Sequence, residues 1–398
     1  MPQIAYPETL EKFWTEQIHE VTGFDEVDTA WQHIGRAVQR LSDGFTSDRP
    51  ETFSDYFRLP INRVAYGLFF FPQTWQRVHF AADELIQFWK WQSAGEKTDP
   101  IQILDLGAGT GAGALSLGHL LRQSGLEAPI QLHLADHSRG GLLEATHAFN
   151  RVKTQIFPNT RLTTEVVDLS SGNLVPGDQA PPEYDIILLS FALNEVSRPG
   201  VDSVPLMESL LKRLKPRGLL LWVEPAQKIT SEALMHLQHQ LCLSETCFPW
   251  GPHLHGTPCP MLESGGKFWQ HEVRNWTPPV TVEKANRQLW RQIHSLKFTW
   301  AAVSKVAPPA RPAPEESIFR LVSPVASIKG RYIFSALNAA GQRHEFDIQT
   351  RNLDRDGKKR LESIQRGAIC EIKDALPLKK SNSWRIQSEQ DLILLYPV

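Results

Sequence analysis

The chain has 398 residues, a formal net charge of −2 at pH 7 and 41% hydrophobic residues. That length allows about two or three domains with cores of their own, and the near-neutral charge excludes a general attraction to nucleic acid or to an anionic membrane. No apolar run approaches the roughly 20 residues that a membrane-spanning helix needs. We therefore expect neither a membrane nor DNA as a partner.

The N-terminal region is acidic and helical in pattern. Glutamates stand at positions 8, 11, 16 and 20, whereas a transit peptide avoids acids and a signal peptide needs an apolar core. The sequence thus predicts a cytoplasmic protein. Residues 1–95 read as a helical region, because apolar residues recur at three- and four-residue spacing from Leu10 to Val21 and from Trp75 to Trp89. No catalytic signature stands out there, and we interpret the region as a helical cap or a partner surface.

Residues 96–304 show a different pattern, in which short apolar runs alternate with helix-like segments. The runs are IQILDL, IQLHLAD, TTEVVDL, YDIILLSF and GLLLWVEP. Strands that alternate with helices predict a parallel, doubly wound sheet. We therefore expect an α/β, Rossmann-like domain, with a Pro/His/Cys-rich insertion at about 242–276.

The last part of the chain predicts a small all-β domain. A proline-rich stretch at 305–317 reads as a semi-rigid linker. Residues 318–398 then show short strand-like runs, with turns at Lys329-Gly330 and Ala340-Gly341, which favours an OB-like fold. From 329 to 398 there are 13 Lys and Arg against 9 Asp and Glu, a net charge of +4. This balance is compatible with RNA contact, although a solvated surface would look the same.

The segment ILDLGAGTGAGALSLGHLLRQ joins the first expected strand to a helix through a glycine-rich turn. Glycine is needed where the backbone turns tightly and approaches a ligand closely, and the helix N-terminus presents free N–H groups. Gly107, Gly109 and Gly111 fit the G-x-G-x-G turn used for S-adenosylmethionine. The same stretch also reads as the G-x-G-x-x-A turn of a dinucleotide site.

Polar residues at the ends of the next strands help to decide between these cofactors. Asp136 lies just beyond the second strand, where an acid can accept hydrogen bonds from both ribose hydroxyls, and Asp168 follows the third, where an acid can bind the adenine amino group. Either carboxylate could instead only cap a helix. Asn194 and Glu195 lie at the exit of the fourth strand. Glu195 could orient a substrate or cap a helix, so we name no catalytic residue.

This series of strands and strand ends resembles the class I S-adenosylmethionine-dependent methyltransferases. The resemblance implies a Rossmann-like methyltransferase fold with S-adenosylmethionine as its cofactor. It also implies the residues that hold this cofactor, which are Asp105, Gly107, Gly109, Gly111, Asp136, Asp168 and Asn194.

A closer resemblance rests on the order of the motifs that follow. They are LSFALNEV, LKPRGLLLWVEPA, the Pro/His/Cys segment, FWQHEVR, LKFTWAAVSK and FRLVSPVASIKGRYIFSAL. From about residue 55 onward the chain is similar to a methyltransferase-like family associated with the small ribosomal subunit of bacteria and mitochondria. This implies a role in translation, with the small subunit or its rRNA as partner. Two alternatives stay open: a methyltransferase acting on a small molecule or a protein, and a non-enzymatic binding protein with a vestigial fold.

In that family four cysteines hold an iron–sulfur cluster, and the resemblance matches only two of them here. Cys259 and Cys370 match, whereas Gly251 and Gln270 stand at the other two positions. Cys247, four residues before Gly251, could replace a lost ligand.

Histidines near these positions could complete a tetrahedral zinc site. They are His253, His255 and His271. Neither zinc nor a cluster follows from the spacing, so we expect no bound metal. We expect instead that the loop keeps its path by aromatic packing, through Trp250, Phe268, Trp269 and Trp276.

Overall fold

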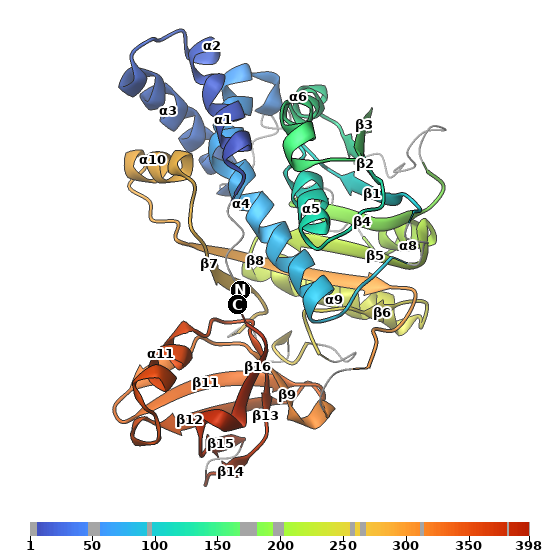
Figure 1. Cartoon of the computed structure of the whole chain (residues 1–398). Coiled ribbons are helices and arrows are strands. Elements are labelled where there is room, and N and C mark those ends of the chain that lie inside the picture. The colour runs from blue at the N-terminus through green and yellow to red at the C-terminus, as the bar shows by residue number, and fades with distance from the viewer. Residues whose placement is uncertain are drawn as a thin grey trace.

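The computed structural model describes residues 6–46, 56–93, 98–167, 181–193, 203–254, 259–262, 268–310, 314–379 and 382–397. Figure 1 shows a group of N-terminal helices beside a sheet domain, with a separate β domain at the other end. None of the helices in these ranges is long and apolar enough to cross a membrane.

The N-terminal region is helical, as predicted. Its elements are α1 (Glu8–Glu16), α2 (Ile18–Thr22), α3 (Val27–Thr46), the 3-10 helix η2 (Tyr56–Arg58) and α4 (Pro60–Gln87). Pro60 suits the first turn of α4, because its fixed φ is helical and the N–H it lacks would have no helical partner there. Gly67 lets the buried Trp14 ring lie against α4, since a Cβ at this position would be 2.1 Å from the ring. The long helix α4 runs along the sheet domain toward the β domain (Figure 1).

The central sheet is doubly wound, with its first five strands parallel. These are β1 (Ile101–Leu106), β2 (Ile130–Asp136), β3 (Thr160–Val166), β4 (Tyr184–Ser190) and β5 (Leu214–Glu224). The sheet order is β3-β2-β1-β4-β5-β8-β6, and β8 (Ser295–Ser304) lies antiparallel to β5. The short strands β6 (Phe248–Pro249) and β7 (Glu272–Asn275) both pair with β8.

Each predicted apolar run overlaps a strand, although two of the strands begin earlier than their runs. Strand β3 begins earlier than the run TTEVVDL, because its pairing with β2 starts at Ile130 and Thr160. Strand β5 begins at Leu214, before the run GLLLWVEP.

Helices cover both faces of this sheet. They are α5 (Ala112–Gln123), α6 (Arg139–Ile156), α8 (Val204–Lys212) and α9 (Lys228–Leu243), whereas α10 (Val280–Gln288) lies beside α3 and α4 (Figure 1). Alternate residues of the strands belong to two cores: Ile103 and Ile186 pack with α4 and α5, while Leu104 and Ile187 pack with α8 and α9. A strand buried on both faces is apolar throughout, which explains why the strand runs were legible in the sequence.

The C-terminal region is the small β domain that the sequence predicts. Its elements are β9 (Ile318–Leu321), β10 (Ala326–Ile328), β11 (Arg331–Asn338), β12 (Arg343–Gln349), α11 (Arg355–Ser363), β13 (Ile369–Ile372), β14 (Ala375–Pro377), β15 (Ser383–Ile386) and β16 (Leu392–Tyr396). The main sheet order is β14-β15-β12-β11-β9-β13-β16. Gly330 and Gly341 take positive φ at the two predicted turns. The described strand pairs of this domain are antiparallel except for β12 with β15, which are parallel.

A buried ion cluster joins α4, the sheet domain and the β domain. It consists of Glu84 on α4, Glu272 and Arg274 on β7, and Arg320 on β9, all at most 2% exposed. Arg320 donates to Glu84 at 2.6 Å and to Glu272 at 2.7 Å, and Arg274 lies 2.8 Å from Glu272. The β domain is therefore attached through fully buried charges.

Candidate functional site

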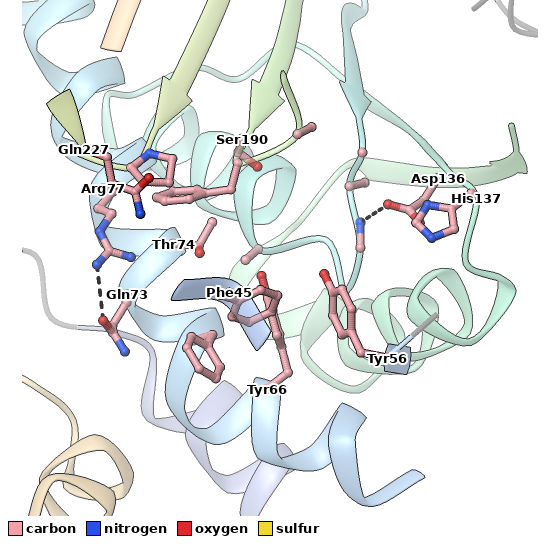
Figure 2. A pocket seen from close by; sticks show the side chains of 18 residues that line it. Phe45, Tyr56, Tyr66, Gln73, Thr74, Arg77, Asp136, His137, Ser190 and Gln227 are labelled. Atoms are coloured by element: carbon pink, nitrogen blue, oxygen red, sulfur yellow. Dashed lines mark hydrogen bonds and ion pairs between the residues drawn. The ribbon is translucent and has the colours of Figure 1, made fainter. Parts of the chain in front are cut away.

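A cavity of about 240 Å³ lies at the carboxyl ends of β1, β2, β4 and β5. Neighbouring strands β1 and β4 run parallel here, and the chain order reverses between them. This is the switch point at which open α/β sheets bind ligands. The wall on the sheet side contains Gly107, Gly109, Asp136, Ser190 and Gln227, several of which are visible in Figure 2.

The glycine turn forms the floor of this cavity. Gly107, Gly109 and Gly111 all take positive φ, at 73°, 52° and 82°. A side chain at Gly109 would also meet the Phe57 ring, 3.2 Å from the added Cβ. The turn leads directly into α5, so the first N–H groups of that helix point toward the cavity floor. Gly107 and Gly109 line the cavity, whereas Gly111 closes the turn behind it.

Asp136 lines the cavity and also braces the glycine turn. Its Oδ2 atom accepts a hydrogen bond from the Gly109 N–H at 2.8 Å (Figure 2), and its Oδ1 atom accepts one from the Ser138 N–H at 2.7 Å. Asp136 therefore lines the cavity and holds the loop at the same time, so its two predicted roles are compatible.

Asp105 does not lie where its side chain could contact a ligand in the cavity directly. Its side chain is fully buried, it is not among the described residues that line the cavity, and its Oδ2 atom accepts from the Ala114 N–H at 2.9 Å. Burial raises the pKa of Asp105 to about 8, against the opposing effect of the Ala114 N–H, and Asp136 raises it further. Asp105 thus anchors the start of α5 as a largely neutral carboxyl.

Three other sequence hypotheses cannot be placed. Asp168, Asn194 and Glu195 lie outside the residues that the structure describes. The segments that carry them follow β3 and β4, the strands beside β2 and β1.

The opposite wall of the cavity comes from the N-terminal helical region, which we had interpreted only as a cap or a partner surface. Helix α4 contributes Tyr66, Phe70, Gln73, Thr74 and Arg77. Each of these positions lies three or four residues from another of the set, so together they share one face of the helix. Residues 73, 74 and 77 are polar, but α4 has polar residues at other positions too, so the sequence carried no signal that singles them out. The aromatic side chains at positions 45 and 56 complete this wall.

The cysteines do not form a metal centre in the described part of the chain, which contains no group of three or more His, Cys, Asp and Glu able to hold a metal ion. Cys247 and Cys259 pack under the central sheet, while Cys370 packs in the core of the β domain. Burial raises the pKa of Cys259 to about 11 and that of Cys370 to about 12. Metals bind the thiolate, which is thereby disfavoured at both residues.

The histidines considered as ligands have other neighbours. His253 is buried with its Nε2 atom 3.1 Å from the Met235 sulfur, and His271 lies 3.1 Å from the Trp269 carbonyl. His255 is outside the described residues.

Aromatic side chains in the described parts of the Pro/His/Cys-rich segment contact the surrounding protein. Trp250 is 1% exposed and donates to the Val306 carbonyl at 2.8 Å. Trp269 and Trp276 donate to the carbonyls of residues 226 and 293. Phe268 is half exposed and lies under the Arg343 guanidinium, 4.6 Å from its ring centre.

Comparison with known proteins adds a weak likeness of fold. No protein-family model and no curated protein matches the chain. Among solved structures, the chain is similar to a putative class I S-adenosylmethionine-dependent methyltransferase from Listeria monocytogenes, with 10% identity, a TM-score of 0.38, and coverage of 76% of this chain and 90% of that one. It is also similar to the CMeT domain of the citrinin polyketide synthase, with 18% identity, a TM-score of 0.36, and coverage of 75% and 70%.

A third similar structure is the N-terminal domain of human METTL16 in complex with SAH, with 12% identity, a TM-score of 0.31, and coverage of 59% and 71%. Likeness at this level carries no information about substrate or residue roles. The description of the fold therefore rests on the strand order and the site geometry of this chain itself.

Proposed function

We propose that this protein is an S-adenosylmethionine-dependent methyltransferase that holds its cofactor in the cavity between the sheet and α4. The observation that carries this proposal is the position of the glycine turn and Asp136 at the switch point of the sheet. Asp136 accepts from the ribose hydroxyls, and the turn from Gly107 to Gly109 lets the backbone approach the ligand. The cofactor supplies an electrophilic methyl group.

Methyl transfer depends mainly on aligning the acceptor with the methyl group and its sulfur. The aromatic part of the cavity, formed by Phe45, Tyr56, Tyr66 and Phe70, suits this task because it excludes water and presents flat faces. Their rings are in mutual contact, with Phe45 and Phe70 centred 5.2 Å apart. These residues orient a bound acceptor, and no general base is assigned.

Titration calorimetry with S-adenosylhomocysteine and, separately, with NAD tests the cofactor. We expect the wild-type protein to bind the first and not the second. Gly109→Arg should abolish binding, because its side chain would enter the cavity from a backbone with φ of 52°. The exposed Gly125, also at positive φ with open space around it, gives the matched control Gly125→Arg. Binding of NAD in preference would overturn the proposal.

For the acceptor, we propose the small ribosomal subunit, on which this protein acts or whose assembly it assists. The motif order and the net charge of +4 from residue 329 onward support this. A groove of about 570 Å³ on β11, β12 and β15 adds a candidate surface, because Trp384 lines it together with Arg331, which lies 3.0 Å from Asp347 in the same lining. In OB folds this strand face binds oligonucleotides, and aromatic rings stack on unpaired bases.

Co-sedimentation with isolated ribosomal subunits tests this acceptor. We expect comigration with the small subunit and not the large one, and we expect it to weaken as salt rises, because phosphate contacts release counterions. Trp384→Ala should reduce it, whereas Trp290→Ala, at a 96% exposed residue outside the groove, should not. No comigration at any salt concentration would favour a small-molecule or protein acceptor. Failure to bind the cofactor as well would favour a vestigial fold.

A further inference from the structure

Arg77 places a positive charge in the wall of the cavity. The proposed role of the glycine turn and Asp136 in holding the cofactor does not explain this charge. Arg77 is the one lysine or arginine among the described residues that line the cavity. It projects from α4, on the side away from Asp136 (Figure 2). Its side chain is partly buried, and burial lowers its pKa to about 10, so the guanidinium is still charged at neutral pH.

The described neighbours of Arg77 orient it without neutralising it. Its Nη2 atom donates to the Gln73 side chain at 3.3 Å, and its guanidinium carbon lies 5.2 Å from the centre of the Phe191 ring. Its Nε atom is buried and has no hydrogen-bond partner among the described residues. Burial is the main influence on the pKa of Arg77, and the phenol of Tyr66 acts in the opposite direction, to raise it.

An anionic partner would stabilise a cation in this position, because burying an unpaired charge is costly. The fully buried Arg320, by contrast, contacts both Glu84 and Glu272. In the cavity, the described protein groups supply no carboxylate to Arg77 within ion-pair distance. A negatively charged group of a ligand in the cavity would supply such a partner.

The expected orientation of the cofactor indicates which of its charged groups would meet Arg77. A cofactor with its ribose at Asp136 would have room for its amino-acid end past Gly107, toward Ser190 and α4, which line the same cavity. The cofactor itself carries two positive charges, on the sulfonium and the amino group, and one negative charge, on the carboxylate. An arginine beside the sulfonium would repel it, whereas an arginine at the far end pairs with the carboxylate, and its planar fork fits that group.

We infer that Arg77 binds the α-carboxylate of the cofactor's amino-acid end, so that α4 closes the cofactor site from outside the sheet. This inference rests on the proposed function. It adds a residue from the N-terminal helical region to the cofactor site, and it explains why that region packs against the open edge of the cavity. Gln73 and Phe191 then act as positioning residues that hold the guanidinium toward the cavity.

Two ligands that differ only at the amino-acid end give a direct test. S-adenosylhomocysteine carries the carboxylate, whereas 5′-methylthioadenosine keeps the adenosine and the sulfur but lacks it. We expect Arg77→Gln to weaken the binding of S-adenosylhomocysteine by about 10- to 100-fold, the range for a lost charged hydrogen bond. The binding of methylthioadenosine should stay within about threefold of wild type. Arg77→Lys should recover part of the loss, because the charge remains without the fork.

The controls separate this inference from its alternatives. Arg36→Gln, at an exposed position on α3, should change neither affinity. The melting temperature of ligand-free Arg77→Gln should not fall below that of wild type, because the change removes an unpaired charge. Equal losses for both ligands, no loss for either, or a clear drop in melting temperature would overturn the inference. No binding of either ligand by wild type would instead overturn the proposed function, and this inference with it.

Discussion

Helix α4 carries a buried glutamate and a partly buried arginine that have opposite surroundings. Glu84, near its C-terminal end, is enclosed by Arg320 and Arg274, and nothing in that cluster reaches the cavity. Arg77, two turns earlier, faces the cavity with a polar and an aromatic neighbour but no acid within the described residues. The first arrangement is complete within the protein and connects its domains. The second is complete only with a ligand, and the difference separates a structural charge from a binding charge.

The ion cluster should show the largest effect on stability. Burial alone would lower the pKa of Arg320, but Glu272 and Glu84 hold it above its usual value. Arg320→Met leaves two buried carboxylates with only Arg274, so we expect a loss of about 3–5 kcal/mol in the free energy of unfolding. Urea denaturation measures this loss.

Two further variants make the test of the cluster specific. Adding Glu84→Gln and Glu272→Gln to Arg320→Met removes the uncompensated charges and should recover part of the stability. Arg360→Met removes an exposed pair with Glu389 at 3.9 Å, and it should cost less than about 1 kcal/mol. If Arg320→Met costs no more than Arg360→Met, the contrast between the two ends of α4 does not hold.

Asp105 is a third kind of buried ionisable group, one that avoids its charge by keeping a proton. Its pKa is about 8 in the folded chain, because of burial, and about 3.9 in the unfolded chain. Between these values the folded state holds a proton that the unfolded state has released. The free energy of unfolding contributed by Asp105 is therefore complete below about pH 4 and is lost as the pH rises through about 8.

Asp105→Asn isolates this contribution. We expect wild type to lose a few kcal/mol more than the variant between about pH 5 and about pH 8, as measured by urea denaturation. The difference between the two proteins is the relevant quantity, because His79, whose pKa burial lowers to about 4, gives an opposite slope in acid. Parallel pH profiles would show that Asp105 is ionised in the folded protein.

On the binding side of the comparison, Asp136→Ala should weaken the binding of S-adenosylhomocysteine by about 10- to 100-fold. The change removes the ribose acceptor and also releases the Gly109 N–H that the carboxylate holds at 2.8 Å. Unlike Arg77→Gln, it should weaken methylthioadenosine equally, since both ligands contain the ribose. Calorimetry on the exposed Glu127→Ala gives the baseline. Unchanged affinity in Asp136→Ala would remove Asp136 from the cofactor site.

The same contrast shows what the sequence could and could not predict. The five parallel strands and the glycine turn were legible because each is encoded within a few consecutive residues. The wall from α4 was missed, since Gln73, Thr74 and Arg77 acquire meaning only once the chain folds them against residues 107–109. The ion cluster has no local signal, because Arg320 meets residues 48 and 236 positions away.

The smallest effect is expected from metal removal. Cys259 and Cys370 belong to different cores, and burial raises the pKa of both thiols. We therefore expect treatment with a chelator to leave the melting temperature unchanged, and Cys259→Ala to cost about 1 kcal/mol, no more than an ordinary buried substitution. Cys242→Ala, at a half-buried cysteine outside the family's pattern, serves as the control. A structural metal contributes folding free energy outright, so a large drop on chelation that Cys259→Ala reproduces would show that this loop still holds a metal.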